Sequence, residues 1–178
     1  MLVTRRLILR PWREADLDGF AAMHADPEVM VDGPMLSLAQ SEAKFRRYRD
    51  AFEHLGLCRW ALARRDGTFL GYVGIMPIPR EHPAAPGFEI GWRLMRQAWG
   101  CGYASEGATA ALRDGFDRLG FREVLSYAAP DNLRSHAVMQ RIGLVRNVAR
   151  DFTATVPQGR WVGWVWVAHS ETWHRATA

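Results

Sequence analysis

The amino-acid sequence predicts an α/β fold with a mixed, largely antiparallel central sheet of about seven strands. Short runs rich in β-branched and aromatic residues alternate with longer runs whose apolar residues recur at helical spacing. An Asp-Gly pair at 66–67 separates two strand-like runs, as in a β-hairpin. The predicted order is β-α-α-β-β-β-α-β-α-β-β, which favours helices packed on a mixed sheet.

The first third of the chain predicts one strand and two helices. The run at 2–12 is rich in β-forming residues and ends beside a proline, which suits an edge strand. The segment 14–25 has apolar residues at helical spacing. Ser37 and Gln40 are spaced as a capping box, so a second helix is expected to begin there and to end at Gly56.

The middle of the chain predicts a hairpin at 58–76, a proline-rich loop at 77–87 and a third strand at 88–94. The third strand has two distinct faces because its side chains alternate. One face carries Phe88, Ile90, Trp92 and Leu94, and the other carries Glu89, Gly91 and Arg93.

The last third predicts a helix from 103 that stops at Gly120, a strand at 123–129, and a short helix capped by Asn132. Two final strands are expected near 145–153 and 160–169. The second contains the run WVGWVWV, which is apolar on both faces. Such a strand packs between two layers or meets a second subunit, so a homodimer is one expectation.

Length and composition predict a single domain over residues 1–178, with room for a core. No apolar run approaches the ~18 residues of a membrane span, and arginines interrupt the N-terminal apolar run, unlike in a signal peptide. Cys58 and Cys101 are the two cysteines and form no CxxC pair. We therefore expect no membrane association and no disulfide framework, and a reducing, cytoplasmic location.

The net charge is +4, and nearly all the positively charged side chains are arginines, since Lys44 is the one lysine. The arginine pairs are dispersed, which indicates either ordinary solvated faces or a surface for a polyanionic ligand. A nucleic-acid-binding protein is disfavoured because no dense basic face is present.

Residues 96–107, RQAWGCGYASEG, place two glycines where a strand gives way to a helix. Glycines allow close approach to the backbone, and a helix N-terminus attracts anions, so this loop predicts a phosphate site. It lacks the lysine of a Walker loop, and Ser105 stands where a dinucleotide fingerprint has its third glycine. A purely structural turn is the alternative from the glycines alone.

Four motifs in order resemble the GCN5-related N-acetyltransferases (GNAT). The run Q97-A-W-G-C-G102 is similar to that family's Q/R-x-x-G-x-G/A acyl-coenzyme A signature. EIGWRLMRQAWGCGYASEG resembles the RimJ/RimL-type subgroup, as do RRLILRPWREADLDGF, PDNLRSHAVMQRIGL and WVWVAHSETW. The resemblance covers most of the chain and implies the GNAT fold, with a splayed strand pair at an acetyl-CoA site.

The resemblance also implies which residues bind acetyl-CoA. The pantetheine arm would pair with the end of the strand at Leu94, the pyrophosphate would lie on the loop, and Asn132 would hydrogen-bond the arm. Asn132 also suits a plain helix cap. The expected acetyl-CoA-binding residues are Leu94, Gln97, Trp99, Gly100, Cys101, Gly102, Tyr103, Ala104, Asn132 and Ser135.

The catalytic candidates are Ser135, Glu89 and Tyr127. By resemblance, Ser135 would protonate the leaving thiolate, because Met139 occupies the position where another branch of the family has a tyrosine acid. Glu89 is the candidate base, since apolar surroundings can raise the pKa of a carboxyl group. Tyr127 would orient water or the amine, or simply pack; a water chain could also take the proton.

No metal site is expected, because His169 and His174 are five residues apart and no HExxH motif occurs. The sequence therefore predicts an N-acetyltransferase that moves acetyl directly from acetyl-CoA to a primary amine. The acceptor is a protein N-terminal α-amine or a small-molecule amine. The alternative is a coenzyme A-binding sensor or scaffold without catalysis.

Overall fold

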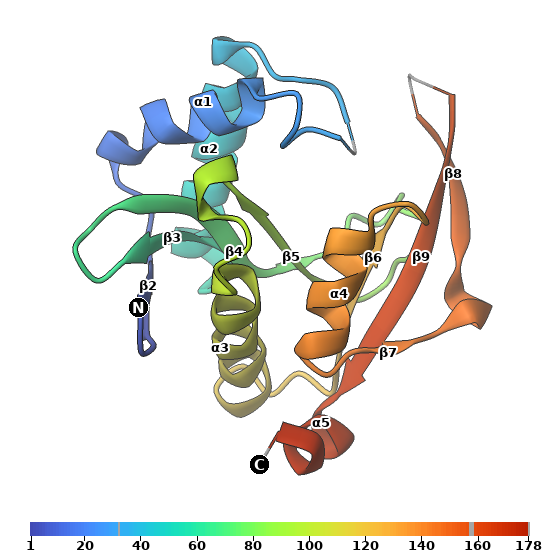
Figure 1. Cartoon of the computed structure of the whole chain (residues 1–178). Coiled ribbons are helices and arrows are strands. Elements are labelled where there is room, and N and C mark those ends of the chain that lie inside the picture. The colour runs from blue at the N-terminus through green and yellow to red at the C-terminus, as the bar shows by residue number, and fades with distance from the viewer. Residues whose placement is uncertain (32, 157–158, 178) are drawn as a thin grey trace. The chain divides into compact units, whose positions relative to one another are not determined.

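The computed structural model of the chain describes residues 1–31, 33–156 and 159–177 (Figure 1). The chain forms two compact units, of which unit 1 comprises residues 1–74 and 91–111, and unit 2 comprises residues 75–90 and 112–178. Strands β4 (Phe69–Pro77) and β5 (Phe88–Leu94) and helix α3 (Tyr103–Asp117) begin in one unit and end in the other. The expected single domain over residues 1–178 stays a prediction.

Unit 1 contains an antiparallel run of strands in the order β1, β2, β3 and β4. Helices α1 and α2 come between β2 and β3 in the chain, and α1 follows a short 3-10 turn, η1. Its further elements are β1 (Leu2–Val3), β2 (Leu7–Arg10), η1 (Glu14–Asp16), α1 (Leu17–Ala25), α2 (Leu38–Leu55) and β3 (Arg59–Arg64).

Local signals define these elements. Ser37 and Gln40 form the predicted capping box at the start of α2, and Gly56 ends that helix at φ +65°. The β3–β4 connection has Gly67 at φ +92°, as the predicted hairpin requires. The start of α1 is anchored by Asp16, which accepts two hydrogen bonds of 2.7 Å from the guanidinium of Arg10.

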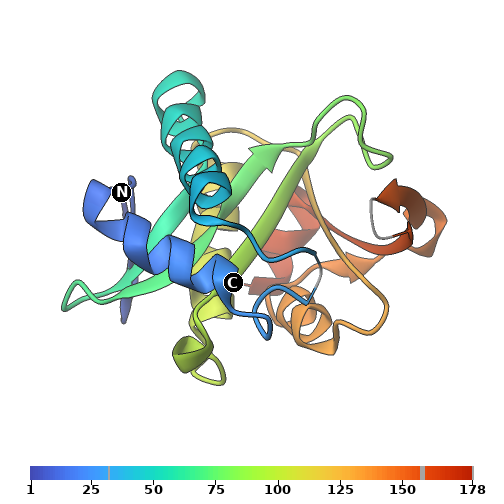
Figure 2. The same ribbon diagram turned by 90° about the horizontal axis from the view of Figure 1, so that it is seen from above.

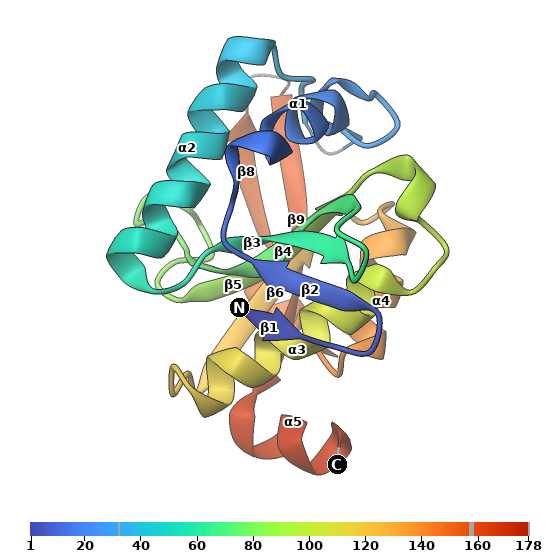
Figure 3. The same cartoon turned by 90° about the vertical axis from the view of Figure 1, so that its left-hand side faces the viewer.

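The strands of unit 1 have helices on both faces. Helices α1 and α2 pack against each other (Figure 2) and lie above β2 and β3 in Figure 3, with the start of α3 below. On the α1–α2 face, the ring of Trp12 lies 5.2 Å from those of Phe20 and Phe45. On the other face, a Cβ at Gly107 of α3 would lie 3.0 Å from Leu62 and Val73, so a glycine allows this close packing.

Unit 2 is organised around β9, which pairs antiparallel with β6, β7 and β8, while β5 and β6 are parallel with Glu89 opposite Leu125. The core cluster contains Ile78, Leu125, Val165 and Val167. The further elements are β6 (Glu123–Ala128), α4 (Leu133–Arg141), β7 (Val145–Arg146), η3 (Val148–Arg150), β8 (Phe152–Val156), β9 (Gly159–His169) and α5 (Ser170–Thr177).

The predicted class, a mixed and mostly antiparallel α/β fold with flanking helices, is confirmed, but among the described residues the sheet has nine strands instead of about seven. The predicted strand at 145–153 is interrupted, because the carboxylate of Asp151 accepts the N–H of Val165 at 2.9 Å. In a continuous strand pair, that N–H would donate to a backbone carbonyl of the neighbouring strand. Here the 3-10 turn η3 separates β7 from β8.

Helix α5 was not predicted as a helix, since the sequence after 169 offers one large apolar residue, Trp173. That residue is 1% exposed and donates its indole N–H to the carbonyl of Ile142 at 2.6 Å. Tertiary burial of this ring therefore stabilises α5. Within the described residues, none of the helices combines the length and apolar character that a bilayer span requires.

Candidate functional site

The predicted phosphate loop lies in unit 1 between the end of β5 and the start of α3. Hydrogen bonds hold its first half: the N–H of Met95 donates to Leu70 at 2.9 Å, and the indole of Trp99 donates to the carbonyl of Leu94 at 3.0 Å. Leu94 is buried, and residues 96–98 form a short 3-10 turn. The loop therefore starts from a fixed strand end.

Gly100 and Gly102 both have left-handed backbones, with φ +72° and +77°. Glycine adopts such angles without the steric clash that a Cβ atom would cause. A Cβ at Gly100 would meet nothing within 4 Å, and Gly100, Cys101 and Gly102 are all exposed. The glycines thus present bare backbone to solvent, as a ligand-binding loop requires.

The residue before helix α3 is Gly102, which has no side chain with which to cap the helix. The N–H of Glu106 donates to the carbonyl of Gly102 at 3.0 Å, which makes glycine the first residue of the helix's hydrogen-bonding pattern. The N–H groups of Tyr103, Ala104 and Ser105 precede that bond and have no intrahelical partner. Together with the helix dipole, free N–H groups at a helix start attract anions.

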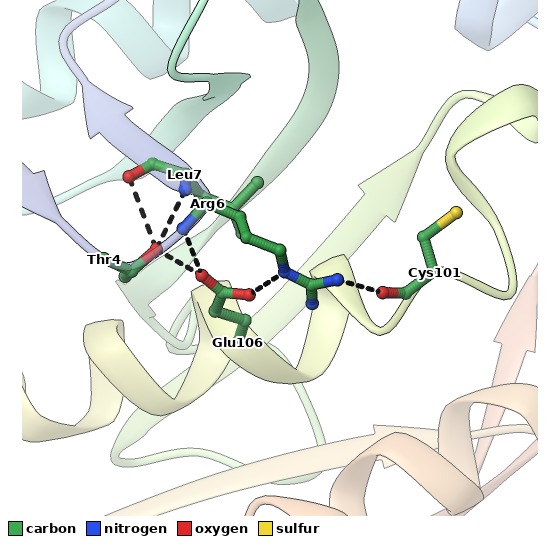
Figure 4. Close-up of polar contacts among 5 residues, drawn as sticks. All are labelled: Thr4, Arg6, Leu7, Cys101 and Glu106. Atoms are coloured by element: carbon green, nitrogen blue, oxygen red, sulfur yellow. Dashed lines mark hydrogen bonds and ion pairs between the residues drawn. The ribbon is translucent and has the colours of Figure 1, made fainter.

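Arg6 connects the β1–β2 turn to this loop (Figure 4). Its guanidinium donates to Oε2 of Glu106 at 2.6 Å and to the carbonyl of Cys101 at 2.9 Å. It also lies over the ring of Tyr103, with Cζ 4.8 Å from the centroid. Arg6 therefore takes up a loop carbonyl and places a positive charge beside the exposed glycines.

Glu106 is the acidic partner that holds Arg6. Its Oε1 also accepts the backbone N–H of Arg6 at 2.9 Å and the hydroxyl of Thr4 at 2.6 Å. Although burial raises the pKa of Glu106, these hydrogen bonds and the arginine lower it overall. The sequence analysis did not predict a role for Arg6 or Glu106 in the loop. The sequence shows only an Arg-Arg pair at 5–6 and a glutamate one hundred residues later, and nothing in it indicates that they meet.

The other predicted acetyl-CoA residues of unit 1 are also described. Gln97 is exposed, and its amide contacts Sδ of Met95 at 3.5 Å. Tyr103 and Ala104 are half-buried in the first turn of α3. The structure thus brings together, in one unit, the predicted residues from Leu94 to Ala104.

In unit 2, Asn132 caps α4, since its side-chain oxygen accepts the N–H of Ser135 at 3.0 Å. Ser135 is half-buried in the first turn of that helix. The next residue, His136, lies 2.9 Å from the carbonyl of Ala129 and accepts the indole N–H of Trp166. These bonds fix the start of α4. Because Nδ1 of His136 accepts the indole N–H, Nε2 carries the proton that is donated to the carbonyl of Ala129. The predicted cap is confirmed, and the ligand role stays a prediction.

Glu89 and Tyr127 lie on neighbouring strands of unit 2, and Glu89 is opposite Leu125, two residues before Tyr127. The ring of Tyr127 stacks on His82 at 4.8 Å. Burial lowers the pKa of His82, whereas the charge of Glu89 opposes that shift. Sequence reasoning did not single out His82, which lies in the proline-rich loop.

Met139 and the two C-terminal histidines have simple surroundings. Met139 is buried, with 1% exposure, and so belongs to the core. His169 and His174 each contact a carboxylate, Glu123 at 3.6 Å and Asp117 at 3.3 Å. Across the described ranges, no three His, Cys, Asp or Glu residues are grouped so that they could hold a metal ion.

Comparisons with known proteins place the chain in a family. The family model for the "Acetyltransferase (GNAT) domain" matches residues 6–145. The chain is 33% identical over 146 residues to the uncharacterized protein YkkB of Bacillus subtilis (strain 168), covering 80% of this chain and 84% of that protein. It is 25% identical over 178 residues to the uncharacterized N-acetyltransferase YnaD of the same strain, covering 97% and 99%.

Among solved structures, the acetyltransferase from Agrobacterium tumefaciens str. C58 is similar, with a TM-score of 0.79 and 29% identity over 94% of this chain and 93% of that one. The chain belongs to the GNAT acetyltransferase family, whose members use acetyl-CoA as the acetyl donor.

Proposed function

We propose that this protein is an N-acetyltransferase that moves the acetyl group of acetyl-CoA directly to a primary amine. The observation that carries the proposal is the loop from Trp99 to Ala104. Its glycines expose backbone beside the N-terminus of α3, and Arg6 adds a positive charge next to them. These are the features that bind a pyrophosphate.

We assign the pyrophosphate to that loop and the pantetheine arm to the end of β5 at Leu94, with Gln97 beside the loop. Asn132 would hydrogen-bond the arm through the amide that also caps α4. The same proposal places the chain in the RimJ/RimL-type subgroup, from whose resemblance these positions are taken. The splayed strand pair belongs to the same proposal.

The chemical step is the attack of a neutral amine nitrogen on the thioester carbonyl carbon. A C–N bond forms, the C–S bond breaks, and coenzyme A leaves as a thiolate. Ser135 would supply a proton or a hydrogen bond to that sulfur. The proton that the amine loses goes to a base or to water.

Glu89 is the proposed base. Its charge acts on His82, whose ring stacks on that of Tyr127, so the three side chains lie in one part of unit 2. Tyr127 would orient the amine or a water. A water chain that carries the proton is the alternative to direct transfer.

The proposed acceptors are the α-amine of a protein or a small-molecule amine. We propose a cytoplasmic location, which the two free cysteines, buried Cys58 and exposed Cys101, support. A homodimer is also part of the proposal: Trp164 of β9 is 38% exposed, and the strand has apolar residues on both faces. Neither a membrane nor a nucleic acid is among the proposed partners.

Thermal unfolding with acetyl-CoA, coenzyme A, NAD and ATP in parallel tests the donor site. A ligand at 100 times its Kd adds about 2.7 kcal/mol, which raises the Tm of a domain of this size by roughly 5–10 °C. We expect this rise with acetyl-CoA and coenzyme A alone. No shift with acetyl-CoA would contradict the proposal.

Coenzyme A release is then measured with short peptides and with small amines. Turnover on either panel identifies the acceptor class. Stabilisation by acetyl-CoA without turnover on both panels would favour the coenzyme A-binding sensor and overturn the enzymatic step.

A further inference from the structure

A group of cationic side chains surrounds Tyr72 on the α1–α2 face of unit 1. Tyr72 lies on β4, is 5% exposed, and packs against Tyr48 of α2 with ring centroids 5.4 Å apart. The positive charges of Lys44 on α2 and Arg93 on β5 act on its hydroxyl. We call Lys44, Tyr72 and Arg93 the donor cluster.

Three cationic side chains act on Tyr72. Burial lowers the pKa of Lys44, as do the charges of Arg93 and Arg59, whereas Tyr72 raises it. Burial would raise the pKa of Tyr72, yet the charges of Lys44, Arg93 and Arg59 lower it overall. In the part of the chain that the structure describes, no carboxylate forms an ion pair with Lys44 or Arg93.

The positions of the rings and the cation agree with this. The rings of Tyr48 and Tyr72 lie 5.4 Å apart, and Nζ of Lys44 lies 5.9 Å from the centroid of the Tyr48 ring. The hydroxyl of Tyr72 has a proton that it can donate to an acceptor. Lysine and arginine are donors only, so neither can accept it.

Arg93 supplies an independent observation. One of its terminal nitrogens donates to the carbonyl of Val29 at 2.9 Å, which holds the side chain against the segment after α1. Its Nε, however, is buried and has no hydrogen-bond partner. An unpartnered donor on a guanidinium is costly, because the charge has lost water without gaining an acceptor. An anion would satisfy it.

The cluster is reachable and lies beside the donor site. Lys44 and Arg93 are half-buried rather than sealed in the core. Arg93 immediately precedes Leu94, the strand end to which we assign the pantetheine arm. A ligand bound by Arg93 from the α1–α2 face would therefore lie next to the acetyl donor, where the acceptor amine belongs.

We propose that Lys44, Tyr72 and Arg93 bind an anionic group, a carboxylate, carried by the acceptor amine. The acceptor class is then an amine that also bears a carboxylate, rather than a polyamine, whose second positive charge the cluster would repel. This inference rests on the proposed function for the position of the acceptor. The donor chemistry of the cluster stands without it.

Paired probes that differ only in charge test the inference. For binding, N-acetylglycine is compared with N-acetylglycinamide by calorimetry, with and without coenzyme A. For turnover, 4-aminobutyrate is compared with butylamine and 1,4-diaminobutane, and phosphoethanolamine with ethanolamine. We expect the carboxylate member to be favoured about 10- to 100-fold, the range of a charged hydrogen bond. Preference for phosphoethanolamine over 4-aminobutyrate would replace the carboxylate by a phosphate.

Variants locate the effect. Lys44→Met and Arg93→Gln should each remove about 10-fold or more of the preference while acetyl-CoA still raises the Tm. Lys44→Glu should shift the preference towards the diamine. Arg46→Met is the matched control, since Arg46 is exposed on the same helix and pairs with Glu42 at 3.1 Å. All variants are compared by urea unfolding.

The outcomes separate the two proposals. Equal binding and equal turnover of the charged and neutral probes would overturn the anion site, whatever acetyl-CoA does. Failure of acetyl-CoA to stabilise the protein would overturn the proposed function, while N-acetylglycine binding would still report on the cluster. If the phenolate of Tyr72 were the counter-charge instead, Tyr72→Phe would lower stability and leave the acceptor preference unchanged.

Discussion

Nε of Arg6 lies 2.6 Å from Oε2 of Glu106, across one hundred residues of sequence, and the same guanidinium donates to the carbonyl of Cys101 at 2.9 Å. Arg6 thereby joins the β1–β2 turn both to the glycine loop and to the first turn of α3 (Figure 4). Its guanidinium lies beside Gly102, at the helix start where we propose that the pyrophosphate binds.

The first prediction concerns this pair. Arg6→Gln should weaken acetyl-CoA binding several-fold, because both the loop restraint and the positive charge are lost. Arg6→Lys should recover only part of the acetyl-CoA affinity, since an ammonium group cannot form the forked pair of hydrogen bonds that the guanidinium donates to Glu106 and Cys101. Binding is measured by calorimetry. Arg46→Gln, which breaks an exposed ion pair with Glu42, should leave acetyl-CoA affinity unchanged. Equal affinity of Arg6→Gln and wild type would remove Arg6 from the site.

The second prediction compares two glycines of the same conformation. Gly100 at φ +72° and Gly120 at φ +69° both have open space where a Cβ would be. Alanine at either position should lower the free energy of unfolding by about 1 kcal/mol. Only Gly100→Ala should also raise the Kd for acetyl-CoA, about tenfold or more, since its methyl group stands in the path of the phosphate. If both variants bind equally well, the loop is structural.

The third prediction is a pH dependence of stability from His24. This side chain is fully buried, donates to the carbonyl of Phe20 at 2.8 Å, and burial lowers its pKa from 6.5 to about 4. The unfolded chain therefore binds a proton between pH 6.5 and 4 that the folded chain does not. Stability should be complete above pH 6.5 and should fall by on the order of 3 kcal/mol towards pH 4.

His24→Gln should be less stable than wild type at pH 7 and should lose less stability over that range. Urea unfolding at several pH values measures both. The exposed His54 supplies the control: His54→Gln should retain the wild-type slope. An unchanged slope in His24→Gln would show that other groups cause the acid sensitivity.

The fourth prediction separates the two roles of Asn132. Asn132→Ala loses the cap on α4 and should destabilise the protein by about 1 kcal/mol. Asn132→Asp keeps an oxygen for the N–H of Ser135 but loses the amide donor. If the amide binds the pantetheine arm, both variants should raise the KM for acetyl-CoA. If Asn132 only caps the helix, the aspartate variant should have the wild-type KM.

Ser135→Ala completes that comparison. As the proposed proton donor to the thiolate, Ser135 should affect kcat more than the KM for acetyl-CoA, because the sulfur becomes charged only as the bond breaks. An unchanged kcat across the pH range would assign the proton to water.

The local signals in the sequence predicted most elements correctly. The capping box at Ser37, the Asp-Gly hairpin and the cap at Asn132 depend on residues within one turn of one another, so a linear reading suffices. The glycine loop was found in the same way, because backbone freedom is a property of the residue itself.

Where prediction failed, the deciding contact was distant in sequence. Helix α5 depends on Trp173 reaching the carbonyl of Ile142, and the break between β7 and β8 depends on Asp151 accepting from Val165. The spacing of apolar residues along the chain indicates neither contact, because each forms only when two distant segments have packed together.

By itself, the sequence determined the fold class, the family resemblance and the loop that presents bare backbone at a helix start. The tertiary structure alone decided the charges around that loop and near the acceptor side: Glu106 beside Arg6, and Lys44 and Arg93 around Tyr72. The reason is physical. Backbone conformation is set by neighbours along the chain, whereas desolvation and charge pairing depend on which side chains folding brings into contact.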